Sequence, residues 1–75
     1  MNAMVPMFDI FVTLPDGSPL WLEAVKGLDE AIRRLHGFAR TQPGRYFIYS
    51  EKTGGVVERF PRDPDEPPSH KSRRN

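Results

Sequence analysis

From residue 7 to residue 14 the side chains alternate strictly between the two sides of an extended segment. One face carries Phe8, Ile10, Val12 and Leu14, and the other carries Met7, Asp9, Phe11 and Thr13. A period of two, with aromatic and β-branched residues, is typical of a half-buried strand. The segment PDGSP at 15–19 then predicts a turn, because Asp-Gly favours turn geometry and proline cannot donate to a strand ladder.

Residues 20–25 are expected to form a second strand, which completes a β-hairpin with the first. Continued alternation would place Leu20, Leu22 and Ala24 on one face and Trp21, Glu23 and Val25 on the other.

After this hairpin the period of the apolar pattern changes from two to that of a helix. Apolar side chains recur at i, i+3, i+4, i+7, i+10 and i+11, which predicts one amphipathic helix. The stripe consists of Leu28, Ala31, Ile32, Leu35, Phe38 and Ala39. The dipeptide Pro-Gly at 43–44 ends the helix, because a residue before proline avoids the α conformation.

The start of this helix has a recognisable signature. Gly27 is a plausible N-cap, and it places Asp29 and Glu30 in the first turn, where negative charge interacts favourably with the helix dipole. Asp29 with Arg33, and Glu30 with Arg34, are also expected to pair at the i,i+4 spacing.

Residues 45–51 (RYFIYSE) predict a third strand with aromatic side chains on both faces. The sequence KTGG at 52–55 supplies a turn, and residues 56–60 return as a short fourth strand. From residue 61 onward the composition becomes rich in proline and charge, which predicts a disordered tail. The chain is therefore expected to have a single domain at 7–60 and a tail at 61–75.

The predicted fold class is α+β, in the order ββαββ, with a mostly antiparallel four-stranded sheet and one helix packed on one face. A single helix covers only one side of such a sheet. The uncovered side is expected to carry Met7, Phe11, Trp21, Val25 and some of the third-strand aromatics. An exposed apolar patch of this kind is typical of an interaction surface.

Composition narrows the possible functions. The 75 residues contain no cysteine, which removes disulfides and thiolate zinc sites and fits a reducing cytoplasm. No apolar run approaches the length of a membrane span, and the first residues make a poor secretory signal. Residues 1–60 carry seven basic and seven acidic side chains, so this part has no bulk electrostatic attraction for nucleic acid. Because so small a chain needs added stabilisation, we expect it to form oligomers.

Candidate chemistry is sparse, and we predict neither enzymatic activity nor a cofactor nor a metal site. The glycines do not have a phosphate-binding spacing, and the serines lack the glycine context of a nucleophile. His36 has no second histidine near it in sequence, and the carboxylates are scattered through turns and helix ends.

The aromatic side chains give the strongest functional signal. Our candidate interaction surface consists of Phe11, Trp21, Tyr46, Phe47 and Tyr49. The favoured hypothesis is a non-enzymatic protein–protein interaction module, forming a homodimer through the open sheet face or an edge strand, or binding another protein. The alternative is a nucleic-acid-binding or antitoxin-like regulatory protein, in which the same aromatics would stack on bases.

Several short motifs carry a resemblance to known proteins: PDG at 15–17, WLEAV at 21–25, GLDEA at 27–31, PGRYFIY at 43–49 and TG at 53–54. With these motifs the chain resembles small bacterial ββαββ proteins of unknown function, over about residues 8–58. It is more weakly similar to HicB-like antitoxin domains, which share a DG hairpin and an EA helix start. HicB-like proteins usually append a DNA-binding segment, and the fifteen residues after Phe60 are expected to be too short for one.

Overall fold

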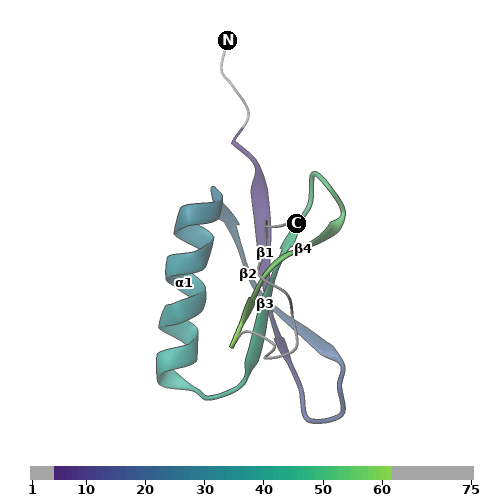
Figure 1. The fold of residues 1–75 in the computed structure, drawn as a ribbon, viewed down its shortest axis with the longest axis vertical. Helices are drawn as coiled ribbons and strands as arrows, with labels where there is room; N and C mark the ends of the chain where they lie inside the picture. Colours follow the sequence, from purple (N-terminus) through teal and green to yellow (C-terminus); the bar gives the residue numbers. More distant parts are fainter. Residues whose placement is uncertain (1–4, 62–75) are drawn as a thin grey trace, which may run out of the picture.

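The computed structural model of the protein describes residues 5–61. It contains four strands and one helix in the order ββαββ, as the sequence predicts (Figure 1). The elements are β1 (Met7–Thr13), β2 (Pro19–Lys26), α1 (Leu28–Thr41), β3 (Arg45–Ser50) and β4 (Gly55–Phe60). The predicted disorder of the tail falls on residues outside the described range, apart from Pro61.

The four strands form one antiparallel sheet in the order β2-β1-β3-β4. β1 and β2 pair through their turn, and α1 then crosses one face of the sheet and returns the chain to the other side of β1. β3 pairs with β1 there, and β4 adds the outer edge. Figure 1 shows α1 along one side of the sheet, with the turn of the β1–β2 hairpin at the same end of the molecule as the end of the helix.

The core lies between α1 and the two central strands. Ile10 of β1, Leu35 of α1 and Ile48 of β3 have no exposed surface. The buried hydrophobic cluster as a whole is Phe8, Ile10, Val25, Ala31, Leu35, Tyr46 and Ile48. The alternation in β1 and the middle of the helical stripe are thereby confirmed, because these side chains point toward one another across a single layer.

The turn of the first hairpin is held by its own polar groups. Gly17 has a φ of 91°, and its backbone N–H donates to the Leu14 carbonyl at 2.8 Å. The Ser18 hydroxyl and backbone N–H donate to Asp16 Oδ1 at 2.6 and 2.9 Å. These donors stabilise the ionised carboxylate, so they hold the pKa of Asp16 below its ordinary value.

A bulge in β2 changes which side chains face the helix. Ile10 pairs with Glu23, while the next residue, Phe11, pairs with Trp21, so Leu22 is the extra residue. Trp21 and Val25, which simple alternation places on one face, therefore lie on opposite faces. Val25 is buried in the core, and its predicted place on the open face is wrong.

The helix starts as predicted but pairs its charges differently. Gly27 occupies the N-cap with a φ of 86°, and its backbone N–H donates to the Pro6 carbonyl at 2.9 Å. The predicted pairs Asp29–Arg33 and Glu30–Arg34 are wrong. Arg33 instead pairs with Glu30 one turn away, and Arg34 crosses to Glu23 on β2, because the bulge turns Glu23 toward the helix.

Two glycine-to-alanine substitutions are expected to change stability in opposite directions. Gly27→Ala should lower the free energy of unfolding by about 1–3 kcal/mol, because an L side chain is strained at a φ of 86°. Gly37→Ala should raise it by about 1 kcal/mol, because this position lies inside α1 with open space around the added methyl group. Urea unfolding of both variants checks the pair, and the same sign for both would contradict this account of the helix start.

Candidate interaction surface

The side of the sheet opposite α1 carries a row of aromatic side chains, and no helix or strand within residues 5–61 lies over it. Strand register places Trp21 of β2 opposite Phe11 of β1, and Phe11 opposite Phe47 of β3. We call these three residues the aromatic row. The row crosses three adjacent strands at one level, meaning one set of directly opposed residues. At the β4 end of the same level, Arg59 lies opposite Phe47.

The rings of the row contact one another closely. Phe11 and Phe47 are stacked, with centroids 5.0 Å apart and planes inclined by 9°. Tyr49 meets Phe11 edge-on, with centroids 6.4 Å apart and planes at 84°. Phe47 is directly opposite Phe11 and Tyr49 is its diagonal neighbour, and both positions are close enough for aromatic contacts on one face of an antiparallel pair. The rings are therefore held by their neighbours before any partner binds.

Trp21 is the most exposed member of the row, with 55% of its surface accessible. Its indole Nε1 donates to Asp9 Oδ1 at 3.1 Å, across the β1–β2 pair. This bond orients a large apolar side chain at the surface and leaves most of the indole open to contact.

Charged side chains occupy opposite ends of this open face. We call Asp9 and Glu51 the acidic end, because Asp9 lies on β1 one level beyond the aromatic row and the Glu51 backbone N–H donates to the Met7 carbonyl at 3.3 Å. A hydrogen bond that the protonated Glu51 carboxyl donates to the Asp9 carboxylate, and then repulsion between the two charges, raise the pKa of Glu51 above its ordinary value. The two carboxylates thus repel each other when both are ionised.

The other end of the face is basic. Arg45 lies opposite Thr13 at the far end of β3, and Arg59 lies one level closer to the middle on β4. Together with Phe47 they line a hollow of about 60 Å³. Within the described residues neither arginine forms an ion pair. We call Arg45 and Arg59 the basic end.

Four of the five candidate residues gather on the open face, and Tyr46 does not. It is only 4% exposed, and its hydroxyl donates to the backbone carbonyls of Gln42 at 2.6 Å and Phe38 at 3.3 Å. Tyr46 therefore secures the end of the helix from inside the core. The alternation within β3 indicates this side, because Tyr46 shares the face of Ile48.

A groove that the sequence analysis missed lies on the helix-bearing side. It has a volume of about 670 Å³ between the β1–β2 hairpin and the end of α1, and Leu14, Leu20, Phe38 and Tyr46 are among its lining residues. Leu20 is 47% exposed and Leu14 is 37% exposed. Alternation places Leu20 on the helix side correctly, but it carries no information about where the helix ends relative to the hairpin.

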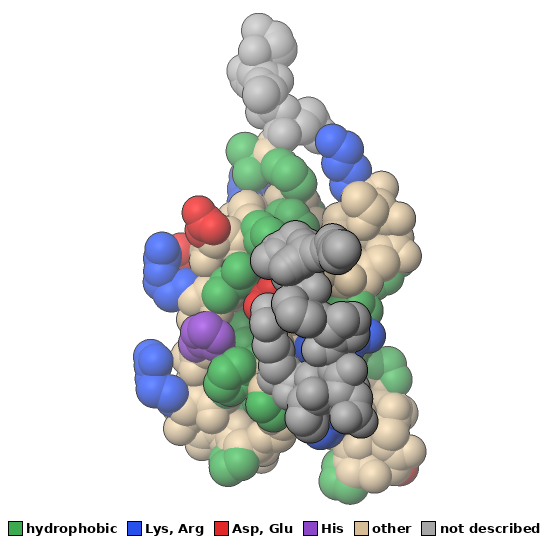
Figure 2. Space-filling view, in the orientation of Figure 1, with side chains coloured by type: hydrophobic (Ala, Val, Ile, Leu, Met, Phe, Trp, Pro, Cys, Tyr) green, Lys and Arg blue, Asp and Glu red, His purple; other side chains and the backbone are tan. Residues whose placement is uncertain are grey.

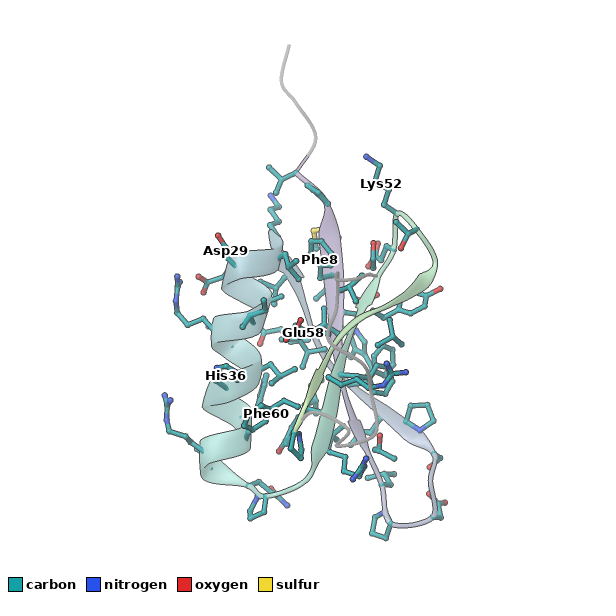
Figure 3. All side chains as sticks on the ribbon, in the orientation of Figure 1. Phe8, Asp29, His36, Lys52, Glu58 and Phe60 are labelled. Carbon is teal, nitrogen blue, oxygen red and sulfur yellow. The ribbon has the colours of Figure 1, made fainter. Side chains whose placement is uncertain are left out.

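The same side carries titratable as well as apolar side chains (Figure 2 and Figure 3). Figure 2 shows hydrophobic side chains gathered beside α1, with Lys and Arg side chains projecting from the outer side of the helix. His36 packs its ring against Phe60, with centroids 4.8 Å apart, and Glu58 lies nearby on β4 (Figure 3). Among residues 5–61 no three His, Cys, Asp or Glu side chains are grouped as metal ligands. Within the same range, no helix is long and apolar enough to cross a membrane.

Comparisons with known protein families, curated proteins and solved structures found no match to this chain. The resemblance to small bacterial ββαββ proteins and to HicB-like domains therefore stays a prediction.

The two tyrosines of β3 should respond differently to loss of their hydroxyl groups. Tyr46→Phe is expected to lower the free energy of unfolding by about 1 kcal/mol, because it removes the hydroxyl that donates to the Gln42 carbonyl just after the helix. Tyr49→Phe, on the open face, should change it by less than about 0.5 kcal/mol. Denaturant midpoints of the two variants check this, and equal losses would contradict the division between core and surface.

The interaction between Asp9 and Glu51 predicts that the free energy of unfolding depends on pH. Asp9→Asn keeps an acceptor for the indole and removes the charge, so the pKa of Glu51 should fall to its ordinary value. Because the raised pKa means that the folded state binds this proton more tightly than the unfolded state, wild-type stability should decline as pH rises from the ordinary pKa of Glu51 through the raised one. The variant should lack that decline. Carboxyl chemical shifts and unfolding midpoints across pH 3–7, measured on dilute protein, test both effects.

Proposed function

We propose that this chain is a cytoplasmic, non-enzymatic protein-interaction module that forms a homodimer through the open face of its sheet. The observation that carries the proposal is the aromatic row, which crosses three adjacent strands on a face that no element within residues 5–61 covers. Tryptophan and tyrosine dominate the energetics of protein interfaces, and both Trp21 and Tyr49 are on this face.

The aromatic side chains of the open face favour binding to an apolar protein surface. An aromatic side chain buries about 150–250 Å² when it is fully covered, which at about 25 cal/mol per Å² contributes several kcal/mol. The rings are already fixed by stacking and by the bond from Trp21 to Asp9. Binding therefore costs little further side-chain entropy.

The edges of the sheet support contact through the face rather than through an edge strand. Both edge strands are bulged, β2 at Leu22 and β4 near Val57. β2 also begins with Pro19, which has no N–H to donate. Bulges and proline are features that hinder edge-to-edge pairing.

The geometry of the row also favours protein over single-stranded nucleic acid. A stacking platform offers ring faces to the bases. Phe11 and Phe47 instead stack on each other, so one face of each ring is already covered. The positive charge of the basic end is the feature that would favour nucleic acid as an alternative ligand.

The test is the mass of the protein as a function of concentration. Trp21→Glu should raise the dissociation constant about 30-fold or more, because it replaces the most exposed ring of the row with a charge. Leu20→Glu is the matched control, since it is adjacent on β2, 47% exposed, and on the helix side of the sheet. It should leave the dimer unchanged. Sedimentation equilibrium from 1 to 200 μM measures all three proteins.

Three outcomes would overturn the proposal. A wild-type protein that stays monomeric at 200 μM removes the homodimer. If Leu20→Glu loses association and Trp21→Glu does not, the contact lies at the groove between the β1–β2 hairpin and the end of α1, and not on the open face. A salt-sensitive shift with single-stranded RNA, lost in Trp21→Glu, would assign the face to nucleic acid instead.

A further inference from the structure

The open face has a charge polarity that runs along its strands. The acidic end, Asp9 and Glu51, lies on one side of the aromatic row, and Arg45 lies on the other. Arg59 adds a second positive charge at the row itself. Lys26, opposite Met7 at the β2 edge, is the one cation on the acidic side of the row that strand register assigns to this face.

Two identical sheets packed face to face are related by a two-fold axis that lies between them. If the axis runs along the strands, the same end of each face meets its own copy, and four carboxylates gather at one end of the interface with only the two Lys26 side chains as cations. If the axis runs across the strands along the row, the acidic end of each copy meets Arg45 of the other, while Arg59, at the level of the row, lies opposite the partner's Arg59. The two arrangements bury the same aromatic row and differ in charge.

We propose that the two-fold axis runs across the strands, parallel to the aromatic row, so that Arg45 of each copy meets Asp9 and Glu51 of the other. This inference rests on the proposed homodimer and adds its symmetry and its charge pairing. Opposing guanidinium and carboxylate groups bind tightly at an interface, whereas like charges placed together there are costly.

The area of the sheet requires that its charged ends take part. Four strands about 4.8 Å apart and roughly 20 Å long give a footprint of roughly 400 Å². A stable interface buries about 800 Å² of accessible surface on each partner. The footprint of the whole face is below this figure and that of the aromatic row is smaller still, so the contact has to use the ends of the strands, where the charges lie.

The lack of opposite-charge partners for Asp9, Glu51 and Arg45 within residues 5–61 of one copy also favours the crosswise axis. Asp9 and Glu51 repel each other, and Arg45 has no ion pair among the described residues. Covering two carboxylates at an end of the face where strand register places one cation, Lys26, is unfavourable, because the lost hydration is only partly compensated. With the crosswise axis, the acidic end of each copy contacts Arg45 of the other, so the dimer contains two such contacts.

Charge reversal with mixing tests the axis directly. Arg45→Glu and Glu51→Lys should each raise the dissociation constant about tenfold, because each dimer then contains two like-charge contacts. An equimolar mixture of the two variants should regain wild-type affinity. In the mixed dimer the new glutamate faces the new lysine, and the native Arg45 faces the native Glu51. Arg40→Glu is the charge-matched control and should leave the dissociation constant unchanged, because Arg40 is exposed in the last turn of α1, on the covered side of the sheet.

Sedimentation equilibrium measures the homodimers, and native mass spectrometry counts the mixed dimer. Both substituted side chains are exposed, and circular dichroism confirms that each variant folds. A monomeric wild-type protein defeats the proposed function itself. A wild-type dimer that neither variant weakens, or that mixing fails to restore, defeats only the crosswise axis.

Discussion

One helix of fourteen residues against a sheet of four strands sets the character of this protein. A helix about 10 Å across covers one face of such a sheet and leaves the other to solvent or to a partner. Every core residue lies in the layer between α1 and the strands. The sheet therefore has one face covered by α1 and one open face. The aromatic residues of β1, β2 and β3 form much of the open face.

The position of α1 in the chain also determines which strands are central. Because the helix carries the chain over β1, β3 pairs with β1 and both strands have neighbours on each side. Phe11 and Phe47 are brought together in this way, although 35 residues separate them in the sequence. A connection that placed β3 beside β2 would have left the two rings apart.

Local periodicity was sufficient to predict the element order, the N-cap at Gly27 and the faces of β1. It failed where a single extra residue interrupts the ladder, because the bulge at Leu22 reverses the alternation that follows it and moves Val25 into the core. The ion pair between Arg34 and Glu23 was missed for the same reason. For the surface, alternation was enough to separate Phe47 from Tyr46, but the stacking of Phe47 on Phe11 depends on strand order, which no local pattern encodes.

The bulge in β2 also makes the two sides of the strand respond differently to a change in chain length. Leu22, the extra residue, packs against the core from a position that has no counterpart in the β1 ladder. Deleting one residue there would restore a regular ladder and remove core volume, yet the indole of Trp21 would still lie opposite Phe11. A change in the length of the chain at this point thus alters the interior without moving the exposed surface.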